Sequence, residues 1–169
     1  TAYEIIPSLV GSEMCIRDRA MHLAVVIVDT DSGEVTLEDY FTADDCGVIV
    51  NPMIVEGQIH GGLAQGIGQA VMEHVVYDDE GTGQLLSGTF LDYAMPRASD
   101  LPGVRCTFIE TAAPSNPLGV KGGSETGTIG APAAIGNAVV DALWDLGVRH
   151  VPLPITAQSV WREIRAVAG

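Results

Sequence analysis

Hydrophobic and polar positions first form a clear pattern at Met21. Residues 22–29 are rich in β-branched side chains, and residues 35–41 alternate apolar and polar positions. The segment 31–33 between them reads DSG, so the two runs predict a β-hairpin. A further strand is expected over residues 104–110.

Later segments carry helical spacing. Three helices are expected over residues 53–75, 131–146 and 156–167. Asn51 followed by Pro52 is typical of a helix N-terminus. For the second helix we expect Pro132 in the first turn and Gly147 as the stop, and for the third we expect Thr156 as the N-cap.

These elements predict the fold class. Strands and helices are intermixed, and the early hairpin requires antiparallel pairing, so we predict an α+β fold of two layers, with helices packed on a mixed β-sheet. Residues 20–169 are expected to form one domain. Residues 1–19 show no clear periodicity, and SLVGSEMCIRDR (8–19) resembles a translated sequencing adapter. We interpret residues 1–19 as a non-native or irregular N-terminal segment.

Charge and composition narrow the function classes. The chain has 8 Lys and Arg against 22 Asp and Glu, a formal charge of −14, which disfavours nucleic acid and anionic lipid as partners. No apolar run reaches the roughly 20 residues that span a bilayer. The three cysteines are widely separated and offer no disulfide framework. The four histidines are scattered, and we assign no metal ligand among the side chains. We expect a soluble protein of the reducing cytoplasm.

The expected helix over residues 53–75 is unusually rich in glycine. Each glycine costs up to about 1 kcal/mol of helix propensity relative to Ala, so a close approach by a backbone or a ligand is expected. Gln58 and Gln65 lie seven positions apart, within about 20° around the axis, with Gly62 between them. Carboxamides suit the nitrogen rings of a pterin. The alternative is a solvated polar face whose small residues pack against a neighbouring helix.

A second candidate is the glycine-rich loop LGVKGGSETGTIG (118–130). Its bare amides can cradle an anion, and the helix N-terminus expected after it favours an ionised Glu125, the state that a general base needs. The alternative is that Glu125 only complements the helix dipole, with Lys121 as its surface partner. Neither the phosphate-loop order GxxxxGK[ST] nor the dinucleotide fingerprint GxGxxG is present.

Three segments carry a family resemblance. They are DDCGVIVNPMIVEGQIHGGLAQGIGQA (44–70), LLSGTFLDYAMPRASDLP (85–102) and NPLGVKGGSETGTIGAPAAIGNAV (116–139). Taken in this order, they resemble the C-terminal half of molybdenum hydroxylase large subunits, the family of xanthine dehydrogenase, aldehyde oxidase and carbon monoxide dehydrogenase. The resemblance covers about residues 21–166.

The resemblance implies an oxidoreductase with a molybdenum–pyranopterin cofactor, in bacteria commonly molybdopterin cytosine dinucleotide. Such enzymes hydroxylate aldehydes, purines or other heterocycles, or oxidise carbon monoxide, with oxygen derived from water. Iron–sulfur clusters and FAD are then expected on partner subunits or other domains. The other expected partner is a small-molecule substrate.

The resemblance also assigns site residues. Glu125 occupies the place of a family glutamate that acts as base beside the metal, although Ser124 stands where the family most often has Gly. Gln65 matches a glutamine that contacts the pterin, and Gln58 is its neighbour. The remaining predicted cofactor contacts are Gly62, Gly66, Lys121, Gly122, Gly123 and Ser124.

Family large subunits are much longer than this chain, so we expect the chain to be inactive by itself.

Two other functions remain open from the sequence. A non-catalytic cofactor- or partner-binding module is the main alternative. A hydrolase using Ser124 and Glu125 is disfavoured because no histidine is positioned beside them.

Overall fold

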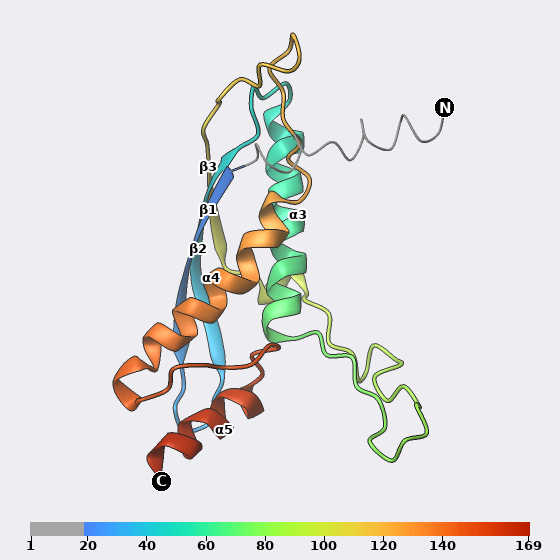
Figure 1. Ribbon diagram of the computed structural model, residues 1–169, viewed down its shortest axis with the longest axis vertical. Coiled ribbons are helices and arrows are strands. Elements are labelled where there is room, and N and C mark those ends of the chain that lie inside the picture. The colour runs from blue at the N-terminus through green and yellow to red at the C-terminus, as the bar shows by residue number, and fades with distance from the viewer. Residues whose placement is uncertain (1–18) are drawn as a thin grey trace.

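The structure, a computed structural model, describes residues 19–169 (Figure 1). All but the last residue of the predicted N-terminal segment 1–19 lies outside the described residues. The strands are β1 (Arg19–Val28), β2 (Val35–Asp45) and β3 (Gly103–Phe108). The helices are α3 (Pro52–Val71), α4 (Thr126–Ala142) and α5 (Ala157–Ala168), with the 3-10 turns η1 (Ala98–Asp100) and η2 (Trp144–Leu146). The predicted α+β class is confirmed.

The three strands form one mixed sheet. Their order is β1-β2-β3, with β1 antiparallel and β3 parallel to β2. The β1–β2 turn is tight because Gly33 takes φ +78° and the carboxylate of Asp29 accepts a 2.9 Å hydrogen bond from the N–H of Asp31. The hairpin and the mixed sheet are therefore as predicted.

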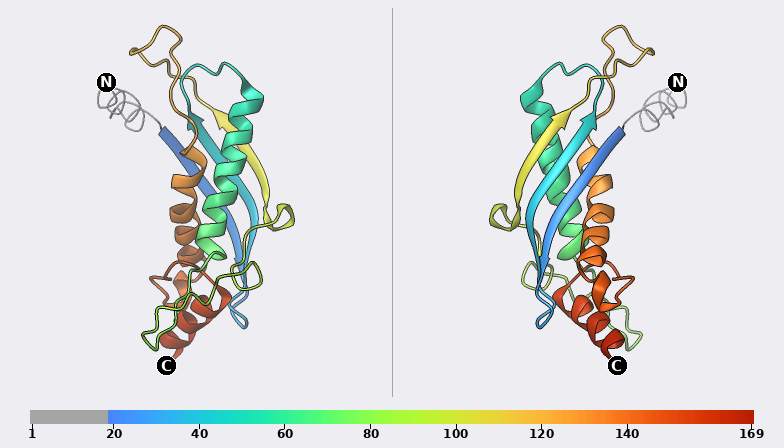
Figure 2. Two further views of the ribbon diagram at one scale, coloured as in Figure 1. Left: turned by 90° about the vertical axis from the view of Figure 1, so that its right-hand side faces the viewer. Right: turned by 90° about the vertical axis from the view of Figure 1, so that its left-hand side faces the viewer.

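Helices α3 and α4 lie on the same face of this sheet, and in the right-hand panel of Figure 2 the strands stand in front of both. The core between the helices and the sheet includes Tyr40, Ile59, Leu63, Ile67, Ile135 and Val139, each at most 1% exposed. Burying one aliphatic side chain of this size contributes about 1.5–3 kcal/mol. Hydrophobic burial thus fixes the helices on one side of the strands. None of the helices in residues 19–169 is both long and apolar enough to cross a bilayer.

Helices α3 and α4 touch through backbone where both lack side chains. A Cβ atom at Gly127 would lie 2.5 Å from the carbonyl oxygen of Ile59, and one at Gly66 would lie 2.6 Å from the Cβ of Ala131. A Cβ at Gly62 would meet the Cα of Gly127 at 3.1 Å. These glycines therefore permit direct helix contact. This is the neighbouring-helix packing considered as the alternative for Gly62 and Gly66.

Helix α4 begins earlier than the sequence suggested. It starts at Thr126, so the predicted start at residue 131 is wrong, and Pro132 lies inside the helix. Because proline has no N–H, the carbonyl of Thr128 loses its intrahelical donor and is crowded by the proline ring. At this point α3 presents Gly66, and its missing side chain leaves room, since a Cβ there would lie 3.0 Å from the Thr128 oxygen.

Helix α3 begins as predicted. The side chain of Asn51 accepts a 3.3 Å hydrogen bond from the N–H of Ile54, which caps the first turn. The helix ends at Val71, before the predicted end near residue 75, because Met72 already has a non-helical conformation with φ −130°.

The C-terminal segment follows the predicted stop and start signals. Gly147 takes φ +96° directly after η2 and stops the helical path. The hydroxyl of Thr156 accepts a 3.2 Å hydrogen bond from the N–H of Ser159 and caps α5. Helix α5 then buries Val160 and Ile164 in the core.

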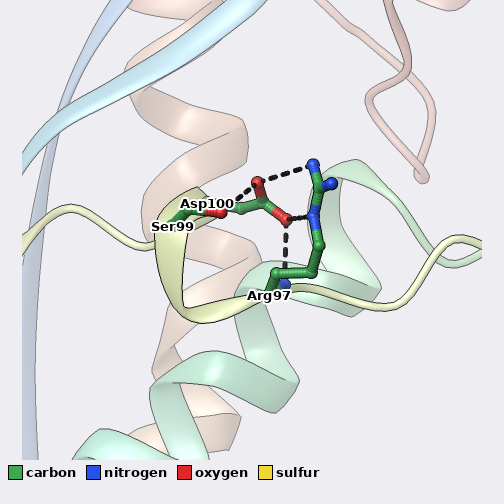
Figure 3. Close-up of polar contacts among 3 residues, drawn as sticks. All are labelled: Arg97, Ser99 and Asp100. Atoms are coloured by element: carbon green, nitrogen blue, oxygen red, sulfur yellow. Dashed lines mark hydrogen bonds and ion pairs between the residues drawn. The ribbon is translucent and has the colours of Figure 1, made fainter.

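The turn η1 leads the chain into β3. The Arg97 guanidinium donates to both carboxylate oxygens of Asp100 at 3.1 Å each, and Asp100 also accepts the N–H of Arg97 at 2.8 Å (Figure 3). The Ser99 hydroxyl adds a 3.4 Å contact to the same carboxylate. Because the Arg97 side chain is 78% exposed, the pair orders the turn and contributes at most about 1 kcal/mol.

The helix contact gives a matched pair of variants. Gly66→Ala should lower the free energy of unfolding by about 2 kcal/mol, because the new methyl overpacks the contact with α4. A Cβ at Gly61 would meet nothing within 4 Å, so Gly61→Ala should raise stability by up to about 1 kcal/mol through helix propensity. Urea unfolding measures both, and shifts of the same sign would contradict the close contact.

Candidate functional site

A cavity of about 370 Å³ lies between the first turns of α3 and the segment 120–124. Four of the predicted site residues line it: Gln58, Lys121, Gly123 and Ser124. Gly122 lies between two of them in sequence. The remaining wall is largely apolar and includes Val48, Ile54 and Val120. A volume of this size, apolar with a few polar groups, is typical of a small-molecule site.

Backbone pairing holds the segment 119–123 beside the end of β2. Gly47 and Val120 form an antiparallel bridge, and the N–H of Lys121 donates to the carbonyl of Cys46 at 3.0 Å. A Cβ at Gly123 would lie 2.8 Å from the Cys46 sulfur, so the loop packs tightly on this residue. The position of the loop is thus set by the strand that precedes α3.

A buried ion pair fixes the same segment. Lys121 Nζ lies 2.6 Å from Asp45 Oδ2, with side chains only 7% and 8% exposed. The alternative in which Lys121 is the surface partner of Glu125 is therefore wrong. Asp45 Oδ1 also accepts the N–H groups of Gly47 and Thr111, each at 3.1 Å.

The environment of Asp45 keeps it ionised. Burial by itself raises the pKa of this carboxyl, but hydrogen bonds from Lys121 and from the backbone of Gly47 and Thr111 outweigh it and bring the pKa to about 2. The sequence did not single out Asp45 as a site residue. The sequence feature that could have indicated a buried acidic partner is Lys121, which is the only lysine of the chain and stands in an otherwise uncharged stretch.

Glu125 is the N-cap residue of α4 and is exposed. Its carbonyl accepts the N–H groups of Thr128 (3.0 Å) and Ile129 (3.1 Å), while its side chain makes no capping hydrogen bond. The carboxylate therefore sits at the positive end of the helix dipole with its oxygens uncommitted to the helix. It directly follows Ser124, which lines the cavity.

Gln65 lies where α3 meets the first turn of α4. The hydroxyl of Thr128 donates to Gln65 Oε1 at 3.3 Å and to the carbonyl of Gly62 at 3.0 Å. The glycine-rich helix and the loop that carries Glu125 are thus adjacent. Gln65 is nearly two turns from Gln58 along α3 and does not line the same cavity.

A second polar cluster lies beneath the first turn of α4, and the sequence did not predict it. His22 Nδ1 and the Tyr40 hydroxyl are 3.0 Å apart, and the His22 ring packs against Gly130. Asp44 is fully buried nearby, and neither of its carboxylate oxygens has a hydrogen-bond partner within residues 19–169. Burial lowers the pKa of His22, which favours the neutral imidazole.

Within residues 19–169, no group of three or more His, Cys, Asp or Glu side chains is arranged to hold a metal ion. Asn51 and Gln58, with their carboxamides, and Ser124, with its hydroxyl, are among the residues that line the cavity beside α3. Groups of this kind bind an organic ligand through hydrogen bonds.

Comparison with known proteins adds relatives to this geometry. The chain is 42% identical over 146 residues to the nicotine 6-hydroxylase large subunit of Paenarthrobacter nicotinovorans. It is 37% identical over 145 residues to the carbon monoxide dehydrogenase large chain of Hydrogenophaga pseudoflava. Each match covers 86% of this chain but only 18% of the relative.

Solved structures give the same result. Quinoline 2-oxidoreductase from Pseudomonas putida 86 matches with a TM-score of 0.81 and 45% identity, over 85% of this chain and 18% of that one. The reconstituted carbon monoxide dehydrogenase from Oligotropha carboxidovorans matches with a TM-score of 0.85 and 30% identity, over 89% and 18%. The family model of the molybdopterin cofactor-binding domain matches residues 12–102, more than half of the chain. The chain therefore belongs to the molybdopterin cofactor-binding domain family of the molybdenum hydroxylases.

Proposed function

We propose that this chain is part of a large subunit that hydroxylates aldehydes, purines or other heterocycles, or oxidises carbon monoxide, with water-derived oxygen. The observation that carries the proposal is the cavity where Gln58 meets the loop 121–124, directly before Glu125. Relatives named for catalysis make a non-catalytic binding module the less favoured alternative. We also propose that the fold has two layers and that the protein is cytoplasmic.

The cavity fits a pterin cofactor by its donors. Gln58 offers a carboxamide, which donates and accepts as the fused rings of a pterin require. Asn51, the N-cap of α3, lines this cavity, and α4 begins two residues after the cavity-lining Ser124, so the dipoles of both helices favour an anionic group. When bound, the molybdenum–pterin group would supply the redox chemistry.

The proposed cofactor contacts are Gln58, Gln65, Gly62, Gly66, Lys121, Gly122, Gly123 and Ser124. They differ in how they would act. Gln58 and Ser124 line the cavity with polar side chains, and Gly123 lines it with bare backbone, while Gly122 adjoins it in sequence. The ammonium of Lys121 is committed to Asp45, so its role is to hold the loop in place.

Glu125 is the proposed catalytic residue. Its carboxylate has no hydrogen bond within the helix cap and lies next to the cavity-lining Ser124. A carboxylate at this position, with its oxygens uncommitted to the helix, can accept a proton from substrate or water as a general base. Ser124 places a hydroxyl where the resembled family most often has glycine, which bears on the room left for substrate.

We propose molybdopterin cytosine dinucleotide as the cofactor, with iron–sulfur and flavin subunits as the route for electrons. Relatives carry the names of large chains and subunits, and the carbon monoxide dehydrogenase large chain is one of them. The small-molecule substrate enters the same cavity region.

The decisive test uses the complete protein purified with its neighbouring subunits, analysed for molybdenum and pterin. Glu125→Gln should keep both contents near the unaltered level and lower turnover by about 10²–10⁴-fold, the usual contribution of a general base. The expected Glu125→Gln protein thus contains molybdenum and pterin but has this strongly lowered turnover. Absence of pterin from the unaltered protein would overturn the proposal, and full activity of Glu125→Gln would remove this residue from the mechanism.

The isolated chain should be inactive. It spans 18% of the relatives, so most of a large subunit is absent from the matched region. The chain would be incubated with molybdenum cofactor and assayed for aldehyde, purine or carbon monoxide oxidation with an artificial electron acceptor. Turnover in this assay would contradict the expectation.

The buried ion pair gives a prediction on pH. The folded pKa of Asp45 is about 2, against about 3.9 for an unfolded aspartate, so its contribution is present above about pH 4 and is lost as pH falls toward 2. Urea unfolding should show a steeper loss of stability over this window in the unaltered chain than in Asp45→Asn/Lys121→Met.

The single variant Lys121→Met should cost about 3 kcal/mol of stability at neutral pH, because it leaves Asp45 buried and unpaired by charge. The double variant should recover most of this loss, since it removes both charges. Equal stability of the single and double variants would show that the pair does not hold the loop.

A further inference from the structure

The sheet is apolar on both faces. Toward the helices, side chains such as Val26 and Leu37 pack against the core. On the other face, β1 presents Met21, Leu23, Val25 and Ile27, which are 67%, 55%, 42% and 56% exposed. This bare side of the sheet faces the viewer in the right-hand panel of Figure 2. A strand that is apolar on both sides is typical of a sheet that is covered on both sides.

These side chains form a single patch. Leu23 lies two positions after Met21 on β1 and pairs with Phe41 on β2. The apolar row of β1 therefore extends onto β2. We name Met21, Leu23, Val25, Ile27 and Phe41 the outer face. At its border the Arg105 guanidinium lies 5.1 Å from the Phe41 ring centre and 3.8 Å from Asp39, an ion pair without net charge. An apolar centre with a polar border is typical of a protein interface.

We propose that the outer face docks against the part of a molybdenum hydroxylase large subunit that lies beyond the region matched by this chain. This inference rests on the proposed function. The matched relatives are much longer, since the chain spans only 18% of each, so each relative supplies a long stretch of its own subunit beyond the matched region. Nothing within residues 19–169 covers the outer face.

Charge argues against a second copy as the occupant. Each chain carries a formal charge of −14, so two copies repel one another as they approach. The outer face has no unpaired charge on its β3 border that would offset this repulsion, because Arg105 already pairs with Asp39. The cavity is lined by α3, which packs on the opposite face, so docking leaves Gln58 accessible.

The test is capture of the full chain by a defined partner. The chain would be co-expressed with a tagged carbon monoxide dehydrogenase large chain of Hydrogenophaga pseudoflava from which the matching region is deleted. Leu23→Lys should reduce capture at least about tenfold, because it puts a charge at the centre of the interface. Val167→Lys makes the same change at an exposed position of α5 and should alter capture by less than about twofold.

Hydroxyl-radical footprinting supplies a second readout that does not depend on a variant. Met21 should be reactive in the isolated chain and protected in the complex. No capture of the unaltered chain, equal capture of both variants, or protection of Met21 in the isolated chain would overturn the proposal. So would a dimer of the isolated chain that Leu23→Lys dissociates, since the occupant would then be a second copy.

The experiment distinguishes failure of the outer-face proposal from failure of the proposed function. Capture that responds to Leu23→Lys, in a complex without bound pterin, would support the outer face and contradict the proposed function. Thermal unfolding of Leu23→Lys and Val167→Lys should stay close to that of the unaltered chain, because both side chains are about half exposed. A loss of capture therefore reports the interface and not the fold.

Discussion

The direct backbone contact between α3 and α4 is the constraint on which the candidate site depends. It requires bare positions on both helices, with Gly127 against Ile59 and Gly66 against Ala131. Because the axes approach so closely, Gln65 reaches the first turn of α4, which follows Glu125. The glycines of α3 weaken the helix by propensity, but this contact offsets the cost for those at the crossing. A Cβ at Gly57 or Gly61 would meet nothing within 4 Å, so the contact does not account for these two glycines.

The end of β2 is the second organising point. The strand delivers two adjacent carboxylates to opposite sides of the sheet, as an extended backbone must. Asp45 meets Lys121 and two backbone N–H groups, and it ties the loop before α4 to the loop before α3. Asp44 enters the layer beneath α4 beside His22. Asp45 thus fixes the loop that leads to Glu125, whereas Asp44 lies buried without a hydrogen-bond partner within residues 19–169.

The sequence predicts most of the fold because its signals are local. The hairpin, the caps at Asn51 and Thr156 and the stop at Gly147 each depend on a few adjacent residues, and each is present. The start of α4 was misplaced because proline was read by its local preference, whereas Gly66, far away in sequence, makes room for the crowded carbonyl. The ion pair of Asp45 escaped prediction for the same reason, since its partners are 66 and 76 positions away. The family resemblance, and not spacing, supplied the roles of Glu125 and Gln65.

The electrostatics of the cavity follow from these contacts. The chain has one lysine, and Asp45 neutralises it in the cavity wall. The cavity therefore has no lysine ammonium free to attract an anionic ligand. The overall charge of −14 opposes such a ligand at long range. The remaining attraction comes from the positive dipole ends at the starts of α3 and α4, which act over the first turn only. Affinity for an anionic cofactor would thus depend on how closely backbone can approach it, and the cavity wall offers such bare backbone at Gly123.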